Sequence, residues 1–351
     1  MTVRPISLLD RLIATPSLSR QEYATADLIA AFLDENGIVA NRCKNNVWAV
    51  SDNYDSNRPT LLLNSHHDTV KPSATYTLDP FKPTHRDGRI YGLGSNDAGA
   101  SVVSLIETFL RLRNVPLNVN LILAITAEEE FSGKDGIELL LSEFKSLAID
   151  IDMAIVGEPT GLNAAIAERG LMVLDCTANG VSGHAARSEG VNAIYAAMTD
   201  IETLRNFKFE KVSPTLGDIK ISVTQIAAGT QHNVIPDRCT FVADVRTTDA
   251  YSNEEVAKLI SSALQSEVKP RSTRLNASVI AEGHPLVTAA ISLGAKPFVS
   301  PTLSDRALLH NIPALKIGPG DSARSHTADE YIIESEIEEA ITFYYKLIKS
   351  L

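Results

Sequence analysis

Four short apolar segments, each followed closely by histidine or acidic residues, constrain the fold of this chain more than any other feature. The segments are 60–64, 119–126, 153–156 and 314–317. Each is short and rich in Leu, Ile, Val or Ala, as expected of a strand that is buried on both faces. Such strands occur in parallel sheets that helices cover on both sides. The segments therefore predict an α/β fold with a mostly parallel sheet.

Helices are expected to cover this sheet. Two of them are predicted over residues 98–113 and 334–348. A third is predicted near the N-terminus, where Ser19 and Glu22 have the Ser-x-x-Glu spacing of a capping box. The helical period continues from there to about Asn36, and Gly37 supplies a stop signal.

The middle of the chain has a different pattern, in which half-buried strands alternate with two helices. The strands are expected at 171–178, 219–227, 239–247 and 272–280, and the helices at 191–204 and 254–264. The order β-α-β-β-α-β is that of a ferredoxin-like split unit. We therefore expect a larger domain made of 1–168 and 281–351, interrupted by a small α+β domain at 169–280.

Composition and charge restrict the class of protein. The chain has 351 residues, which suits two domains, and its formal net charge of −11 argues against binding to nucleic acid or an anionic membrane. The N-terminus lacks the pattern of a signal peptide, and the apolar runs are too short to span a bilayer. The three cysteines are scattered, as reduced packing residues would be. We therefore expect a cytoplasmic protein.

Histidine and acidic residues follow each of the four predicted strands. In chain order they are His66 and Asp68, Glu128 to Glu130, Glu158, and, after a Gly-Pro-Gly loop, His326. Ligands bind at the carboxyl ends of the strands in open α/β sheets, so these side chains are expected to converge. Asp97, in a glycine-rich loop that opens a helix, adds a further donor.

The donors expected at this edge are too many for one catalytic zinc ion. Two histidine nitrogens and three carboxylates suit Zn²⁺ or a similar divalent ion. One catalytic zinc takes three protein ligands and a water, whereas this set suffices for two ions that share one carboxylate. Two ions about 3.5–4 Å apart can together polarise a carbonyl group and lower the pKa of a water molecule. The sequence therefore indicates a two-metal hydrolytic site.

Residues beside the ligands are expected to support them. Asp68 lies two positions after His66, on the same side of an extended chain, so it can accept the second ring N–H of His66. Adjacent glutamates diverge, so one of a pair can bind metal while the other acts as a general base. His67 points the other way and is interpreted as a packing residue.

Taken together, these motifs resemble those of the M20 metallopeptidases. This family includes aminoacylases, acetylornithine deacetylases, succinyl-diaminopimelate desuccinylases and glutamate carboxypeptidases. The resemblance covers nearly the whole chain, and it is specific only when all the motifs are taken in order. They are His-x-Asp at His66 and Asp68, Gly-Ser-Asn-Asp ending at Asp97, the acidic triplet ending at Glu130, Gly-Glu-Pro around Glu158, and the late His326.

The resemblance implies two zinc ions per subunit, which Co²⁺ can replace. One zinc would be bound by His66 and Glu158, and the other by Glu130 and His326, while Asp97 would bridge them. Glu129 would be the general base, and Asp68 would orient His66. The triplet Glu128 to Glu130 leaves an ambiguity of one residue. The family usually has Asp-Glu-Glu there, which implies that Glu128 takes the first position and that the base is Glu129.

The resemblance also implies that the inserted domain is a lid and dimerisation domain. His184 would reach the active site of a partner subunit in a homodimer and steady the tetrahedral oxyanion. Asn233 and Arg246 would touch the substrate, and Arg246 would clamp a carboxylate. Ordinary surface roles stay open for these three residues, and a site role stays open for His232.

Within the family, segments 65–72 and 94–101 most resemble acetylornithine deacetylase-like enzymes of the Bacteroidetes type. This implies that the chain removes an acetyl or succinyl group from a small N-acyl amino acid, ornithine or citrulline, in arginine biosynthesis. Most other members have a single histidine and an Asp-Val-Val-Pro-like ending where this chain has His-His-Asp-Thr-Val-Lys-Pro. Lys71 and Arg324 flank the predicted ligands and either bind an acyl carboxylate or are solvated cations.

Other functions remain open from the sequence. The same site would serve a dipeptidase, an aminoacylase, a carboxypeptidase or a succinyl-diaminopimelate desuccinylase. A catalytically silent metal-binding protein would lack a ligand or the base, and no such loss is visible. A phosphoesterase is disfavoured, because the chain has neither a glycine-rich phosphate cradle nor an arginine cluster.

Overall fold

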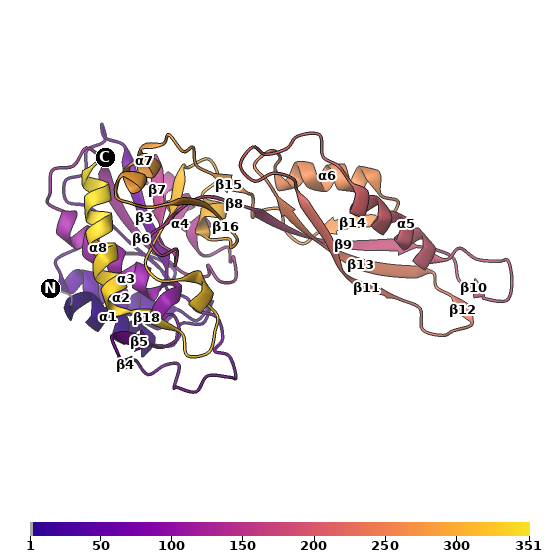
Figure 1. Ribbon diagram of the computed structural model, residues 1–351, viewed down its shortest axis with the longest axis horizontal. Helices are drawn as coiled ribbons and strands as arrows, with labels where there is room; N and C mark the ends of the chain where they lie inside the picture. Colours follow the sequence, from indigo (N-terminus) through magenta and orange to yellow (C-terminus); the bar gives the residue numbers. More distant parts are fainter. Residues whose placement is uncertain (1–2) are drawn as a thin grey trace. The chain divides into compact units, whose positions relative to one another are not determined.

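The computed structural model describes residues 3–351 and divides into two compact units (Figure 1). Unit 1 comprises the chain up to Ile166 together with Ile280–Phe298 and Ser304–Leu351. Unit 2 comprises Ala167–Val279 and Val299–Leu303. The insertion was expected at 169–280, and the short segment Val299–Leu303 is grouped with the inserted unit as well.

Unit 1 is built from helices and a large mixed sheet. Its helices are α1 (Val3–Ile13), α2 (Tyr23–Glu35), α3 (Ala100–Leu112), α4 (Ile137–Ser146), α7 (Pro285–Ser292) and α8 (Glu334–Lys349), with short helical turns η1 (Ser95–Gly99), η2 (Asp305–Leu308) and η3 (Ser322–Arg324). Its longer strands are β2 (Asn46–Val50), β3 (Thr60–His66), β6 (Asn120–Thr126), β7 (Met153–Val156) and β17 (Ala314–Lys316). Shorter strands are β1 (Asn41–Cys43), β4 (Thr84–Arg86), β5 (Arg89–Tyr91), β16 (Pro297–Ser300) and β18 (Tyr331–Ile333).

The four predicted buried strands are confirmed and lie side by side. Their order is β6-β3-β7-β17, and all three pairings are parallel. Antiparallel β2 and β1 extend the sheet beyond β6, and β8 (Ala164–Glu168) continues it beyond β17. Because the four central strands run in one direction, their carboxyl ends form one edge, as the sequence predicted.

Helices cover both faces of this sheet, which explains why its central strands are apolar throughout. Leu61 and Leu63 belong to a core cluster that includes residues of α2, α3 and α8. On the opposite face, Trp48 of β2 packs edge-on against Phe144 of α4, with ring centroids 5.1 Å apart. The α/β fold class is thus confirmed. Within residues 3–351, none of the helices has the length and apolar character needed to cross a bilayer.

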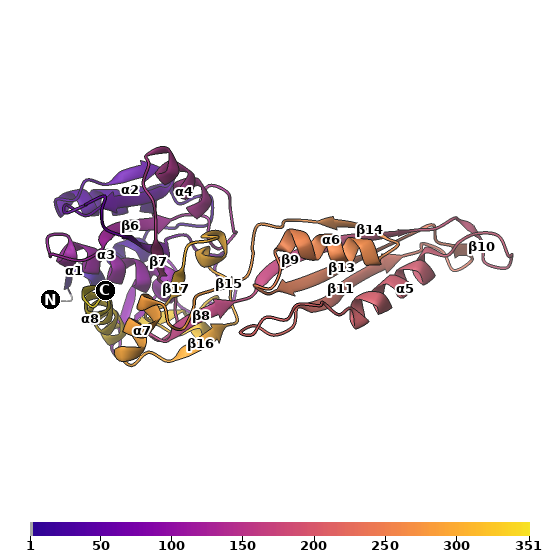
Figure 2. The same cartoon turned by 90° about the horizontal axis from the view of Figure 1, so that it is seen from above.

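Unit 2 is a ferredoxin-like α+β unit. Its elements are β9 (Gly170–Asn179), β10 (Gly183–His184), α5 (Ala193–Asn206), β11 (Lys220–Ala228), β12 (Val234–Ile235), β13 (Arg238–Thr247), α6 (Asn253–Ala263), β14 (Glu267–Pro270) and β15 (Ser278–Val279). The antiparallel sheet has the order β11-β13-β9-β14. Both helices contribute to one apolar cluster with β9 and β13, so they cover the same face (Figure 2).

One strand of unit 2 differs from the prediction. The last strand of the sheet is β14, at Glu267–Pro270, and not the segment 272–280. Val268 pairs with Cys176 of β9 and packs against the apolar cluster, which fixes the position of the strand. The chain leaves the sheet after Pro270, and only Ser278–Val279 of the predicted segment is a strand, paired with β8.

Candidate functional site

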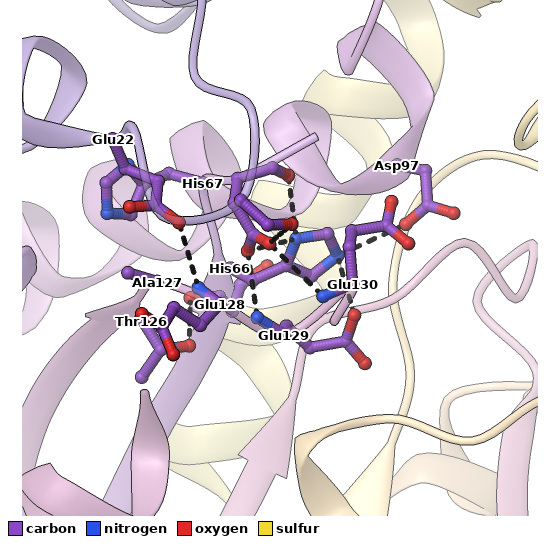
Figure 3. A network of polar contacts seen from close by, with 12 residues as sticks. Glu22, His66, His67, Asp97, Thr126, Ala127, Glu128, Glu129 and Glu130 are labelled. Carbon is purple, nitrogen blue, oxygen red and sulfur yellow. Dashed lines mark hydrogen bonds and ion pairs between the residues drawn. The ribbon is translucent and has the colours of Figure 1, made fainter. Parts of the chain in front are cut away.

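The predicted ligands converge at the carboxyl edge of the central sheet in unit 1. Figure 3 shows His66 and Asp97 beside the acidic triplet Glu128 to Glu130. His66 is the last residue of β3 and is almost fully buried. The triplet Glu128 to Glu130 follows β6, and Glu158 follows β7 by two residues. His326 arrives on the loop that connects β17 to β18.

Asp97 lies between the two histidines. Its Oδ1 atom is 3.2 Å from Nε2 of His66, and its Oδ2 atom is 3.7 Å from Nε2 of His326. The two oxygens of one carboxylate therefore face two different imidazole rings. This is the arrangement that a carboxylate shared between two cations requires.

Each histidine has a further carboxylate beside it. Nε2 of His66 is 3.8 Å from Oε1 of Glu158, and Nε2 of His326 is 3.0 Å from the carboxylate of Glu130. Ligand atoms of His66, Asp97 and Glu130 all lie within 4.8 Å of one another. Glu129 is close to the first histidine, with Oε2 3.9 Å from Nε2 of His66.

The chemistry of this donor set fits bound divalent cations. Nδ1 of His66 lies 3.1 Å from the backbone carbonyl of Asp68, so Nδ1 carries a proton, and Nε2, which faces Asp97 and Glu158, is the ring atom that can bind a cation. Lone pairs of nitrogen and carboxylate oxygen repel one another unless a cation or a proton lies between them. Asp97, Glu129, Glu130 and Glu158 bring four potential negative charges, which two divalent ions would balance.

The electrostatics of the protein alone point the same way. Burial raises the pKa of Glu129 well above its ordinary value, and the neighbouring Glu158 and Asp305 raise it further, whereas His66 lowers it. Burial also raises the pKa of Glu158 to about 8. The hydrogen bond to Glu130 raises the pKa of His326 to about 9. These carboxyl groups therefore resist ionisation together until positive charge is supplied.

Asp68 lies beside the ring N–H of His66 and also supports the neighbouring acidic turn. The ring N–H of His66 is closest to the backbone carbonyl of Asp68, and the Asp68 carboxylate is 3.4 Å from Nδ1. That carboxylate also accepts the backbone N–H groups of Glu129, at 3.1 Å, and Glu130, at 3.2 Å. It also accepts the hydroxyl of Ser19 at 2.7 Å. Asp68 thus fixes the turn that carries Glu129 and Glu130.

The predicted capping box at Ser19 and Glu22 is wrong. Helix α2 begins at Tyr23, and its N-cap residue Glu22 makes no side-chain capping bond. The fully buried Glu22 carboxylate instead accepts the side-chain amide of Asn45 at 2.9 Å and the backbone N–H of Glu128 at 3.3 Å. Ser19 and Glu22 therefore both hold the acidic turn in place, a role hidden by a spacing that is also typical of a helix start.

The neighbours of this turn have distinct surroundings. His67 is buried, and its ring contacts Thr25 Oγ1 at 2.8 Å and the Asn45 carbonyl at 2.9 Å, which agrees with a packing role. Burial lowers the pKa of His67 to about 4, so this ring is neutral. The carboxylate of Glu128 accepts the backbone N–H of Asp135 at 3.3 Å. Glu128 is thus engaged with its own loop.

A buried aspartate behind the site was missed from the sequence. Oδ2 of Asp305 accepts the Thr126 hydroxyl at 2.6 Å, and Thr126 is the last residue of β6. Burial raises the pKa of Asp305 to about 6. No local motif marks this residue, because it reaches the site from the turn η2, far along the chain.

The predicted site residues of unit 2 fall into two places. His184 pairs with Val234, and the Asn233 carbonyl accepts the N–H of Ala185, so His184 and Asn233 lie together on the two-stranded antiparallel ribbon of β10 and β12. Arg246 lies near the other end of β13, eight residues from Arg238, or about 26 Å at 3.3 Å per residue. Its guanidinium pairs with Asp244 at 2.8 Å.

The two flanking cations also differ in their surroundings. Arg324 forms two hydrogen bonds with Glu336, at 2.7 and 3.1 Å, and lies over the ring of Tyr331. This arginine is therefore engaged within unit 1. Lys71 is exposed.

Comparisons with known proteins assign the family. The model of Peptidase family M20/M25/M40 matches residues 62–350. A succinyl-diaminopimelate desuccinylase from Delftia acidovorans is 24% identical over 384 residues, covering 99% of this chain and 98% of that protein. An acetylornithine deacetylase from Myxococcus xanthus is 27% identical over 365 residues, covering 94% of this chain and 91% of that protein.

Solved structures share the fold over the whole chain. A dinuclear metal-binding peptidase of the M20 family from Bacillus subtilis has a TM-score of 0.75 at 19% identity and covers 100% of this chain and 99% of its own. A metallo-carboxypeptidase of the M20 family from Sulfolobus solfataricus has a TM-score of 0.74 at 17% identity, with 98% of each chain covered. The predicted resemblance, and with it the hydrolase class, is confirmed: because the family model spans most of the sequence, the chain belongs to the peptidase family M20/M25/M40.

Proposed function

We propose that this M20 enzyme is a two-metal amidohydrolase that removes an acetyl or succinyl group from N-acylated ornithine or citrulline. The observation that carries the proposal is the position of Asp97 between two histidines, each with a second carboxylate beside it. Zinc is the ion proposed, since imidazole and carboxylate donors suit it, and Co²⁺ is expected to replace it.

The proposed ligand assignment follows these distances. His66 and Glu158 hold one ion, His326 and Glu130 hold the other, and Asp97 is shared. In this assignment Glu129, whose Oε2 atom is 3.9 Å from Nε2 of His66, binds neither ion, which leaves its carboxylate available for proton transfer.

When bound, the ions supply Lewis acidity that polarises the substrate carbonyl and acidifies water. The carboxylate of Glu129 takes a proton from the attacking water. It then gives this proton to the nitrogen of the leaving amine as the C–N bond breaks. Asp68, Ser19 and Glu22 keep the turn that carries Glu129 in place throughout, because their hydrogen bonds do not involve the substrate.

Unit 2 is proposed to complete the site in a homodimer. His184 of the partner subunit would donate a hydrogen bond to the developing oxyanion, with Asn233 beside it. Their shared position on the exposed two-stranded ribbon of β10 and β12 supports a joint role. Arg246 is proposed to bind a substrate carboxylate from a separate position, after exchanging its Asp244 contact for the substrate.

A second substrate has support from the relatives. Several of the matched proteins are named succinyl-diaminopimelate desuccinylase, and they align over 99% of this chain. N-succinyl-diaminopimelate has the same scissile amide as N-succinylornithine and the same succinyl and α-carboxylates, with one further carboxylate at its other end. N-succinyl-diaminopimelate is therefore the second candidate.

Amine release tests the substrate directly. The zinc-loaded enzyme is given N-acetyl-L-ornithine, N-succinyl-L-ornithine, the two citrulline counterparts, N-succinyl-L,L-diaminopimelate and a set of dipeptides. We expect one ornithine or citrulline derivative to react with kcat/KM of about 10⁴ M⁻¹ s⁻¹ or more. A preference for the diaminopimelate derivative would select the second candidate, and cleavage of dipeptides alone would contradict both.

A further inference from the structure

Glu330 is a buried carboxylate that the predicted ligand set does not include. It lies four residues after His326, and only 2% of its surface is exposed. Its Oε1 atom accepts the backbone N–H groups of Asn96, at 2.8 Å, and Asp97, at 2.9 Å. Its Oε2 atom accepts the N–H of Gly94 at 3.2 Å. One carboxylate thus accepts three backbone hydrogen bonds from the loop that carries Asp97.

The same loop has a second connection to the segment that carries His326. The side-chain amide of Asn96 donates to the Asp321 carbonyl and to the Ser325 hydroxyl, each at 3.1 Å. Its oxygen accepts the Asp321 N–H at 3.1 Å. The loop of Asp97 and the segment 321–330 are therefore joined by side chains on both, although more than 220 residues separate them in the sequence.

We propose that Glu330 is a positioning residue that fixes the Asp97 carboxylate between His66 and His326. The inference rests on the proposed metal site, in which Asp97 is the shared ligand. Asp97 can face both rings only while its backbone stays where the Glu330 carboxylate holds it. A buried N–H group left without an acceptor is costly, so loss of the carboxylate would make the loop rearrange.

A purely structural role predicts a different outcome. If Glu330 only stabilised unit 1, its removal would lower the melting temperature and leave the affinity for metal unchanged. If it positions Asp97, the affinity for metal falls by more than the loss of a comparable buried carboxylate would explain. Residues that orient metal ligands commonly change metal affinity about 10- to 100-fold when they are replaced.

Glu107 provides a matched control. It is a buried carboxylate of the same unit, 4% exposed, on α3. It bonds to Arg4 and Arg111, both at 2.8 Å, and to neither the Asp97 loop nor the ligands in any contact described for residues 3–351. The variant E107Q therefore reports the cost of neutralising a buried carboxylate away from the site.

The experiment compares wild type, E330A, E330Q and E107Q as full-length chains freed of metal. Zn²⁺ and Co²⁺ binding is measured by competition with a chelator, the Co²⁺ absorption spectrum is recorded, and the melting temperature of each metal-free protein is determined. We expect E330A to bind about 10- to 100-fold more weakly with an altered Co²⁺ spectrum. The metal affinity of E330Q, which keeps one acceptor oxygen, should lie between those of E330A and wild type. The metal affinity and Co²⁺ spectrum of E107Q should match those of wild type.

The inference is overturned if both Glu330 variants bind metal with the affinity and spectrum of E107Q. Should E330A fail to fold, the comparison of E330Q with E107Q decides in the same way. Failure of the underlying metal site is a distinguishable result, because the wild type itself would then bind fewer than two ions. Neither readout depends on which substrate the enzyme cuts.

Discussion

At the scale of single residues, the carboxylates around this site divide into two groups by what they face. Asp97, Glu130 and Glu158 face the two imidazole rings. Asp68 and Glu22 face backbone N–H groups of the turn that carries the acidic triplet. The first group can bind cations, and the second holds the turn that carries Glu129 and Glu130.

Ser19 provides a test of the second group. The variant S19A removes the hydroxyl that donates to Asp68 at 2.7 Å. A hydrogen bond to a charged group is worth about 1.5–3 kcal/mol, so the Asp68 carboxylate should shift and loosen the turn of Glu129. We expect kcat to fall about tenfold or more, which corresponds to about 1.4 kcal/mol, while two metal ions remain bound.

The control for this variant is S104A. Ser104 is a buried serine in α3 whose hydroxyl has no hydrogen-bond partner among the described residues. Steady-state kinetics and metal content of the two variants are measured side by side. Equal kinetics for S19A and S104A would show that the contact with Asp68 does not support catalysis.

Local patterns in the sequence predicted which residues follow the strands. They did not predict which residues support the turns after those strands. His66 and Glu158 could be located because each follows an apolar run directly. Ser19 has the same spacing to Glu22 as a helix cap, and only the fold brings it to Asp68, 49 residues away. Asp305 reaches Thr126 across 179 residues, with no local pattern at either end.

At the scale of elements, the parallel strands were predictable because burial on both faces gives continuous apolar runs. The last strand of unit 2 was not, because its residues Glu267–Pro270 include only one large apolar side chain, Val268. The alternation at 272–280 was the stronger pattern, and tertiary pairing of Val268 with Cys176 outweighed it.

His85 joins three elements of unit 1 and gives a prediction of pH dependence. Its ring contacts Asp10 of α1 at 2.9 Å and Glu334 of α8 at 3.2 Å. Burial alone would lower the pKa of His85, but these two carboxylates raise it overall. Because the folded pKa lies above the unfolded value of about 6.5, the stabilisation is complete below that pH and is lost as the pH rises through the folded pKa.

The variant H85Q should therefore be destabilised more at pH 5.5 than at pH 9. The difference is expected to stay below about 1 kcal/mol, since 42% of the side chain is exposed and solvent screens the pair. Urea unfolding of wild type and variant at the two pH values measures it. A larger loss at pH 9 would contradict the assigned pKa direction.

At the scale of the whole molecule, the positions of His184 and Arg246 bear on how the enzyme assembles. His184 pairs with Val234, four residues before β13 begins, whereas Arg246 lies near the other end of β13. The eight residues from Arg238 to Arg246 alone span about 26 Å at 3.3 Å per residue. Such a span exceeds the size of one N-acyl amino acid. His184 and Arg246 of one chain are therefore not expected to touch the same substrate molecule, which agrees with a site completed by a partner subunit.

Mixed dimers test this assembly. Chains carrying E129Q and H184A are produced together with different tags, and the dimer that carries both tags is purified. One site of such a dimer would combine an intact Glu129 with an intact His184 of the partner subunit. We expect about half of the wild-type activity per dimer, whereas each variant alone should lose about 10²-fold or more. No recovery, or a monomeric wild type, would contradict the assignment of His184.

The central claim is that Glu129 transfers a proton from the attacking water to the leaving amine, while other residues bind the metal ions and hold Glu129 in place. Its most direct measurement is the turnover and metal content of E129Q beside E128Q, whose native carboxylate accepts the Asp135 N–H within its own loop. The account predicts two bound ions in both variants, a loss of about 10²–10⁴-fold in kcat for E129Q, and nearly unchanged turnover for E128Q. Near-normal turnover of E129Q with both ions bound would contradict it.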